Sequence, residues 1–199
     1  YYGQDLRKLI LERKITEKPG KKFRYLSANT QLLAFILEKA AGKSVSEYAS
    51  EKIWNPLGAS KDALWSLDKE GGVEKAYCCF NAMARDFARI GQLVLNKGKW
   101  NGKQLISEKF IEELSSPASW LMNEYGTGPL DYYSYHWWIT SFNSEKVVYA
   151  RGILGQYIFV VPSKNMVIVR LGEKRCSLRT ANLPSDIFVW LNLAMKLSL

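Results

Sequence analysis

Three side chains that can form hydrogen bonds, Tyr25, Ser27 and Asn29, occur within five residues, directly before a helical pattern. Acyl transfer by a serine needs a nearby group that takes the hydroxyl proton and returns it to the leaving group, and a tyrosine beside cationic side chains can do this. The densest run of positive charge in the chain, Lys18 to Arg24, lies in one loop. A structural interpretation competes, in which Tyr25 is an aromatic residue beside a helix start and Ser27 or Asn29 is the N-cap.

A second set of candidates lies late in the chain, where Ala150-Arg151-Gly152 ends one strand-like stretch and Gly155-Gln156 begins the next. A glycine at such a position lets a substrate approach the backbone closely. The backbone N–H groups that follow it can donate hydrogen bonds to an oxyanion. The competing interpretation is that Gly152 and Gly155 are only turn glycines between two strands.

The remaining reactive side chains indicate no metal chemistry. Cys78 and Cys79 are adjacent, Cys176 is distant and no zinc-site spacing occurs. Since adjacent cysteines rarely bridge each other, we expect neither a zinc ion nor a disulfide, and no other cofactor. His136 is the only histidine, so no other residue can be the base of an internal Ser-His-Asp triad. Its neighbours, YSYHWWI, alternate like a strand, which favours a packed or surface strand position.

Helices in the first part of the chain must position these residues. Gly42 is expected to end one helix, and Ser44-Val-Ser-Glu47 has the capping-box pattern that opens the next. Asn81 is expected to cap a long helix, on which Arg85 and Asp86 are ion-paired structural residues on an exposed turn. Three of the expected helices each have one apolar face. These faces comprise Leu6, Leu9 and Ile10 in the first helix, Leu32, Leu33, Ile36, Leu37 and Ala40 in the helix that ends at Gly42, and Met83, Phe87, Ile90 and Val94 in the long helix.

From about residue 132 the apolar period changes to two, which is typical of strands. Short connections between the stretches favour an antiparallel meander. Pro184 and Ser185 then open an amphipathic helix to Leu197 that can cover one sheet face. The sequence therefore predicts an α+β fold, an antiparallel sheet with flanking helices plus a helical subdomain, with a mostly helical part over residues 1–125 and a stranded part over 126–199. The strand patterns are YSYHWWI, KVVYA, QYIFVVP and NMVIVRL.

Composition excludes several function classes. The 199 residues are 47% hydrophobic, which suffices for a sizeable core, and the longest apolar runs fall far short of the roughly 20 residues of a membrane span. Charged residues interrupt the apolar stretches at the start, unlike a signal peptide. The net charge of +9 is spread over helix faces without a nucleic-acid-binding motif, so we expect no nucleic-acid partner. A basic nucleic-acid binder would lose affinity steeply with salt.

Four segments now indicate a family. FRYLSANTQLLAFILEKAAGKSVSEYASEKIWNPLGA resembles the middle segment of the penicillin-recognising serine hydrolases, which include class C β-lactamases, D-alanyl-D-alanine carboxypeptidases, related esterases and 6-aminohexanoate-dimer hydrolases. NAMARDFARIGQLVLNKGKWNGKQLIS, YHWWI and YARGILGQYIFVVPSKNMVIVRLG are similar to later family segments, in the family's order. The resemblance covers nearly the whole chain. The Tyr-x-Ser and Gly-x-x-Gly-Gln patterns are most similar to the 6-aminohexanoate-dimer hydrolase branch.

The resemblance implies roles for the candidate residues. Tyr25 is placed like the catalytic tyrosine of the family's Tyr-x-Asn motif, and Ser27 or Asn29 then takes the task of the asparagine. Ala150-Arg151-Gly152 occupies the place of the family's Lys-Thr-Gly or His-x-Gly, so Arg151 is the candidate replacement for the usual cation. The residues expected to bind substrate are Ser27, Asn29, Arg151, Gly152, Gly155 and Gln156.

One family motif has no counterpart in its usual place. The family's serine nucleophile and its lysine form a Ser-x-x-Lys at a helix start, upstream of the tyrosine. Here only Ser66-Leu-Asp-Lys69 has that form, and it lies in a loop after the tyrosine, so we expect it not to react. The resemblance thus implies the C-terminal part of a longer serine hydrolase, incomplete at the N-terminus, that forms an acyl-enzyme on amide, β-lactam or ester bonds. The isolated chain is then inactive.

The expected partners follow from this reading. They are a small-molecule or peptide-like substrate and the missing N-terminal portion of the same domain. The resemblance implies a bacterial protein of the periplasm or cell envelope. If the complete protein also lacks Ser-x-x-Lys, the alternative is a non-catalytic module that binds peptide or cell-wall fragments.

Overall fold

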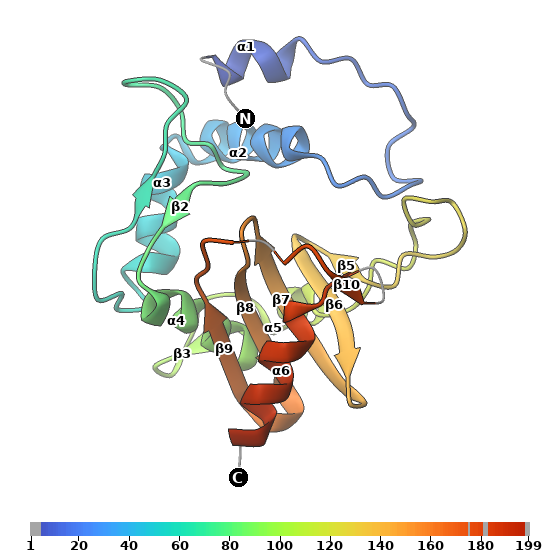
Figure 1. The fold of residues 1–199 in the computed structure, drawn as a ribbon. Helices are drawn as coiled ribbons and strands as arrows, with labels where there is room; N and C mark the ends of the chain where they lie inside the picture. The colour runs from blue at the N-terminus through green and yellow to red at the C-terminus, as the bar shows by residue number, and fades with distance from the viewer. Residues whose placement is uncertain (1–4, 175, 181–182, 198–199) are drawn as a thin grey trace. The chain divides into compact units, whose positions relative to one another are not determined.

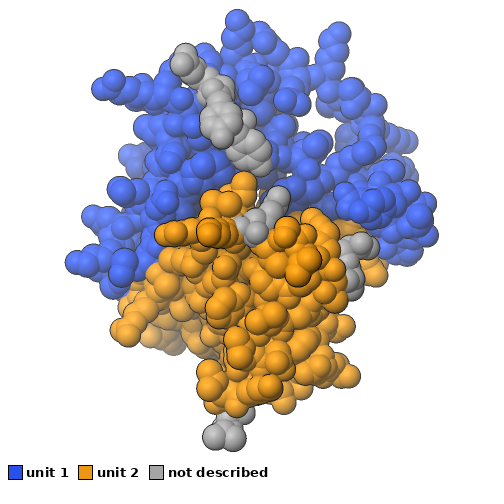
Figure 2. Space-filling view, viewed as in Figure 1, with its two compact units in different colours: residues 1–83, 120–129 blue, residues 84–119, 130–199 orange. Residues whose placement is uncertain are grey.

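The computed structural model describes residues 5–174, 176–180 and 183–197 (Figure 1). The chain divides into two compact units, and each is described by itself (Figure 2). Unit 1 comprises residues 1–83 and 120–129, and unit 2 comprises residues 84–119 and 130–199. The expected boundary at residue 125 separates a helical from a strand-like sequence pattern. The compact units divide the chain differently, because residues 84–119, which contain two helices, belong to the same unit as the later strands. The predicted α+β class is confirmed.

Unit 1 is mainly helical, and its predicted helix ends are confirmed. Gly42 ends the second helix in the left-handed conformation, with φ of 66°. Ser44 and Glu47 form the capping box, in which each side chain accepts a hydrogen bond from the other residue's backbone N–H. The elements are α1 (Leu6–Leu11), α2 (Ser27–Ala41), α3 (Val45–Ala49), the π-helix η1 (Ser50–Trp54) and the paired strands β1 (Leu64–Trp65) and β2 (Phe80–Asn81).

The face of α2 that packs in unit 1 differs from the expected one. Gln31, Ala34 and Phe35 are buried, and Phe35 packs against Leu6 and Ile10 of α1. Helix α2 is apolar on two opposite sides, so the spacing of its apolar residues could not reveal which side packs in this unit. The large side chains of the expected face that are exposed are Leu32, Leu33 and Ile36.

The loop from residue 66 to residue 79 holds the helices of unit 1 through polar contacts. The buried Gln31 donates from Nε2 to the carbonyl of Glu74 at 2.9 Å and accepts at Oε1 from the N–H of Ala76 at 3.0 Å. Both ends of the amide are therefore satisfied inside the unit. A buried amide needs such partners, which is why a polar residue can occupy the packed side of α2.

Two carboxylates complete this loop's contacts. Burial raises the pKa of Asp68, but hydrogen bonds from the backbone N–H groups of Leu6, Val73 and a neighbouring lysine outweigh it and leave the pKa below its ordinary value. Burial likewise raises the pKa of Glu74, but hydrogen bonds from Ser46 outweigh this effect and leave the pKa below its ordinary value. In its charged form, Asp68 therefore fixes the start of α1 and Glu74 fixes the start of α3.

Unit 2 is built on a five-stranded antiparallel sheet in the order β5-β6-β7-β8-β9, which confirms the predicted meander. Its strands are β5 (Tyr133–Ser134), β6 (Trp137–Phe142), β7 (Glu145–Gly152), β8 (Gln156–Val161) and β9 (Met166–Arg170). Its helices are α4 (Ala84–Leu95), α5 (Glu108–Leu114), the 3₁₀ turn η2 (Pro162–Lys164) and α6 (Asp186–Leu197). Two short hairpins pair β3 (Lys99–Trp100) with β4 (Lys103–Gln104), and β10 (Arg179–Thr180) with β11 (Leu183–Pro184).

Helices cover both faces of this sheet (Figure 1). Successive strand residues point to opposite faces. Tyr149 packs with Ile187 and Leu191 of α6, and the adjacent Val148 packs in the cluster that includes Val94 of α4. The predicted role of α6 as the cover of one sheet face is confirmed. Among the residues that the structure describes, no helix combines the length and apolar character needed to cross a bilayer.

The start of α4 corrects two predictions. Asn81 does not cap this helix, because it lies in β2 opposite Leu64 and its amide donates to the carbonyl of Cys79 at 3.1 Å. Asp86 is ion-paired as expected, with Arg89 at 2.5 Å, but its side chain is fully buried and not on an exposed turn. Further along, this helix lies close to the sheet. At Gly91 an added Cβ would lie 2.6 Å from a valine methyl of β9.

Two turns also differ from expectation. Cys78 and Cys79 form a disulfide, contrary to the prediction that they stay unbridged. Cys79 has a positive φ of 66°, and this bend of the chain accompanies the bridge. His136 does not lie in a strand. It is exposed in the two-residue turn between β5 and β6, where Tyr135 and His136 both have positive φ, as such hairpin turns require.

Candidate functional site

Tyr25 lies in the loop that leads into α2, and its side chain is 53% exposed. Ser27 is the first residue of the helix and is half-buried. Asn29 is exposed one turn into the helix, where its N–H donates to the carbonyl of Leu26 at 3.0 Å. The structure thus brings the three predicted residues together at one helix start in unit 1.

The N-cap position of α2 belongs to Leu26, which makes no side-chain capping hydrogen bond. The interpretation of Ser27 or Asn29 as the N-cap is therefore wrong. Serine and asparagine are among the best N-cap residues, yet here they follow an apolar cap. Their presence at this helix start is consequently not explained by capping.

The backbone before Tyr25 is tied to another segment of unit 1. The N–H of Phe23 donates to the carbonyl of Met122 at 2.8 Å, and the N–H of Met122 donates to the carbonyl of Lys21 at 3.0 Å. Phe23 is buried. Arg24, one of the cations near the tyrosine, pairs with Glu17 at 2.7 Å. These contacts hold the backbone segment that leads to Tyr25 in one conformation.

A second group of candidate residues lies at the end of β7 in unit 2 and is described by itself. The ladder between β6 and β7 ends at the pair of Trp138 and Tyr149. The ladder between β7 and β8 continues to the pair of Gly152 and Gln156. Residues 150–152 are thus paired in a ladder on one side only. A strand edge of this kind can hydrogen-bond a substrate amide or stabilise an oxyanion.

Arg151 supplies a positive charge at this edge. Its guanidinium carbon lies 3.8 Å from the ring centroid of Trp138, which is within the range of a cation–π contact. Burial raises the pKa of the nearby Tyr149 to about 12, although the charge of Arg151 acts in the opposite direction. The Tyr149 hydroxyl is buried without a hydrogen-bond partner among the described residues. It therefore stays protonated at neutral pH.

Gly155 and Gln156 both have structural contacts. Gly155 has φ of 81°, and an added Cβ would lie 1.8 Å from the guanidinium of Arg170, which donates to the carbonyl of Gly155. The Gln156 amide accepts from the N–H of Gly172 at 2.9 Å and donates to the carbonyl of the same residue. These contacts fix the hairpin that carries Gly152. Contact of Gly155 and Gln156 with substrate remains a prediction.

Ser66-Leu-Asp-Lys69 lies in a loop of unit 1, as expected. The N–H of Ser66 donates to the carbonyl of Cys79 at 3.1 Å, and Lys69 pairs with Asp5 at 3.5 Å. The serine and the lysine therefore do not share a helix face. Within the described part of the chain, no group of three or more His, Cys, Asp or Glu side chains is arranged to hold a metal ion.

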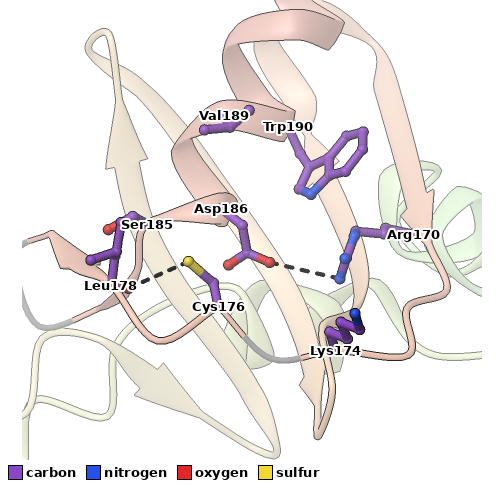
Figure 3. A pocket seen from close by; sticks show the side chains of 8 residues that line it. All are labelled: Arg170, Lys174, Cys176, Leu178, Ser185, Asp186, Val189 and Trp190. Atoms are coloured by element: carbon purple, nitrogen blue, oxygen red, sulfur yellow. Dashed lines mark hydrogen bonds and ion pairs between the residues drawn. The ribbon is translucent and has the colours of Figure 1, made fainter.

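Sequence reasoning missed a surface pocket of unit 2 between the end of β9 and the start of α6 (Figure 3). Arg170 and Asp186 face each other there at 3.7 Å, and Arg170 also lies 5.4 Å from the ring centroid of Trp190. Their separation of 16 residues gives no periodic signal, and only the fold brings them together. The pocket is lined by Arg170, Lys174, Cys176, Leu178, Ser185, Asp186, Val189 and Trp190.

Comparisons with known proteins extend this description. Residues 1–175 match the family described as Beta-lactamase. The 6-aminohexanoate-dimer hydrolase of Paenarthrobacter ureafaciens is 33% identical over 155 residues, which cover 76% of this chain and 39% of that protein. A solved Bacillus anthracis protein assigned as a 6-aminohexanoate-dimer hydrolase aligns with a TM-score of 0.81 at 30% identity, over 97% of this chain and 48% of that one. The chain thus spans less than half of each relative.

The fold also extends to more distant structures. The β-lactamase/D-alanine carboxypeptidase of Yersinia pestis, solved in complex with citrate, aligns with a TM-score of 0.65 at 19% identity. The alignment covers 92% of this chain and 58% of that one. At this identity the likeness concerns the fold alone.

Proposed function

Because this chain belongs to the beta-lactamase family, we propose that it is the C-terminal part of a longer serine hydrolase that cleaves amide, β-lactam or ester bonds through an acyl-enzyme. The observation that carries the proposal is the group of Tyr25, Ser27 and Asn29 at the start of α2. Capping of the helix does not account for these residues. Their family counterpart begins with a catalytic tyrosine.

In the proposed reaction, a serine that precedes this chain attacks the substrate carbonyl. Tyr25, together with an upstream lysine, takes the hydroxyl proton and passes it to the leaving amine or alcohol as the carbonyl bond to that group breaks. Water then attacks the acyl-enzyme, and the released serine recovers its proton. Ser27 or Asn29 hydrogen-bonds the substrate beside the reacting bond.

The end of β7 supplies the other proposed contacts. A backbone N–H near Gly152 stabilises the oxyanion, and the serine's own N–H is the second donor. Arg151 provides the cation where relatives carry lysine or histidine. A substrate with a carboxylate near the cleaved amide, as in a linear amide oligomer, would complement this charge. The name of the 33% identical relative makes 6-aminohexanoate dimer the first substrate to test.

The 199-residue chain by itself is proposed to be inactive, because its one Ser-x-x-Lys lies in a loop. The missing partner is the N-terminal portion of the same domain. The complete protein is proposed to act in the periplasm or cell envelope of a bacterium.

The test uses the complete gene product and compares Tyr25→Phe with Tyr125→Phe. Both tyrosines are exposed in unit 1, but Tyr125 lies outside the candidate site. Hydrolysis of 6-aminohexanoate dimer, a chromogenic cephalosporin and a p-nitrophenyl ester is followed. Loss of a proton-transfer group predicts that kcat falls by roughly 10²–10⁴-fold in Tyr25→Phe, with little change in KM, whereas Tyr125→Phe keeps the wild-type rate.

An unchanged rate in Tyr25→Phe would refute the role of this tyrosine. If the complete wild-type product turns over none of the three substrates but binds peptide or cell-wall fragments, the non-catalytic module replaces the hydrolase.

A further inference from the structure

Helix α2 carries a second apolar side that the described residues of unit 1 leave exposed. One side of the helix packs through Ala34 and Phe35. An α-helix turns once in 3.6 residues, so Leu32, Leu33, Ile36 and Ala40 fall together on the opposite side. Leu32 is 41% exposed, Leu33 is 53% exposed and Ile36 is 56% exposed, and Ala40 is exposed as well. We call these four residues the outer stripe.

An apolar side of this kind is typical of a helix that is buried all round. Singly exposed apolar residues are ordinary, but a contiguous row on one helix marks an interaction surface. The outer stripe extends from Leu32 to Ala40, a rise of about 12 Å along the helix. That length suffices for a packed contact with one further segment.

The lengths of the relatives indicate what covers the stripe. This chain spans 39% of the Paenarthrobacter hydrolase and 48% of the Bacillus anthracis protein, so more than half of each relative lies outside the matched part. The outer stripe also leads to the candidate site. Asn29 precedes Leu33 by four residues and Ile36 by seven, so it lies at the N-terminal end of the same side.

We propose that the outer stripe is the docking surface for an apolar segment of the polypeptide that precedes this chain in the complete gene product. The inference rests on the proposed function, since it takes the chain to be part of a longer hydrolase. Docking there brings the preceding segment beside Asn29 and Tyr25. The stripe therefore couples completion of the fold to completion of the catalytic site.

The experiment compares two double variants in both the complete gene product and the 199-residue chain. Leu33→Glu with Ile36→Glu places two charges on the stripe. Leu11→Glu with Ile15→Glu is the matched control, because these side chains are also apolar and exposed in unit 1 but lie outside the stripe. Thermal unfolding and sedimentation are measured for each protein.

The stripe variant should lower the unfolding midpoint of the complete product by several degrees and leave that of the 199-residue chain nearly unchanged. The control should change neither protein. If the stripe variant of the complete product does not fold, Leu33→Ala with Ile36→Ala gives the same comparison with a smaller shift. Because unfolding is measured without substrate, an inactive but stripe-dependent product would refute the proposed function and keep this inference.

Three outcomes would overturn the inference. The first is an unchanged midpoint of the complete product in both stripe variants. The second is a native product that begins at Tyr1. The third is a 199-residue chain that sediments as a dimer and becomes a monomer in the stripe variant, which would make a second copy the occupant.

Discussion

The two units of this chain hold their elements together in different ways. In unit 2, a sheet with alternating residues buries apolar side chains on both faces, against α6 on one side and α4 and α5 on the other. In unit 1, a small cluster around Phe35 is supplemented by polar contacts from the loop at residues 66–79, and one side of α2 is uncovered. The difference teaches that unit 2 relies mainly on apolar burial, whereas the helices of unit 1 depend more on a few directed contacts.

The largest expected effect lies in the core of unit 2. Phe159 is fully buried, and its ring centroid lies 5.0 Å from that of Tyr157 and 5.6 Å from that of Tyr149. Replacing it by alanine leaves a cavity in the sheet and should cost about 3–5 kcal/mol of unfolding free energy. Denaturant unfolding measures the change. Phe110→Ala, at a site that is 40% exposed, is the control and should cost much less.

A smaller effect is expected from the polar contacts of unit 1. Gln31→Leu keeps the volume of the side chain but leaves the carbonyl of Glu74 and the N–H of Ala76 without their partner. The loss should be about 1–3 kcal/mol in denaturant unfolding. The control is Gln92→Leu, since Gln92 donates to Asn96 one turn along the exposed side of its own helix. Equal losses in the two variants would mean that unit 1 does not rely on directed contacts.

The smallest expected effect is the loss of folding stability at acidic pH when Asp68 is protonated. The folded-state pKa of Asp68 is depressed, so its contribution to stability is present above the unfolded-state pKa of about 3.9 and is lost as pH falls through the lower folded-state value. We expect the amide shifts of Leu6 and Val73 to titrate together in NMR spectra, with a midpoint below the ordinary pKa of an aspartate. Asp68→Asn should abolish this titration. A midpoint above the ordinary value would mean that the backbone hydrogen bonds do not hold the charged carboxylate.

The sequence was informative where a local pattern has one physical solution. The antiparallel meander of strands, the capping box at Ser44 and the glycine end of α2 at Gly42 were all predicted from local spacing. Prediction from the sequence failed where a local pattern is compatible with two structures. The two apolar sides of α2 left its packed face undetermined, and Asn81 was taken for a helix cap although the local chain pairs as a strand.

The candidate residues likewise fall into those that local sequence could reveal and those that only the fold brings together. Tyr25, Ser27 and Asn29 were expected directly before a helix; Tyr25 does precede α2, whereas Ser27 and Asn29 lie within its first turn. Arg170 and Asp186 meet only because β9 and α6 are brought together by the fold, so no spacing in the sequence indicated their pocket. The unpaired edge at residues 150–152 depends in turn on where the ladder to β6 ends.

The most direct test of the hydrolase assignment is mass spectrometry of the complete gene product after reaction with a fluorophosphonate probe. The probe forms a covalent bond with an activated serine and loses fluoride. The account predicts one labelled serine, located before Tyr1 in a Ser-x-x-Lys sequence, and no label on the separate 199-residue chain. Labelling of Ser66, or a complete product that carries no labelled serine, would contradict it.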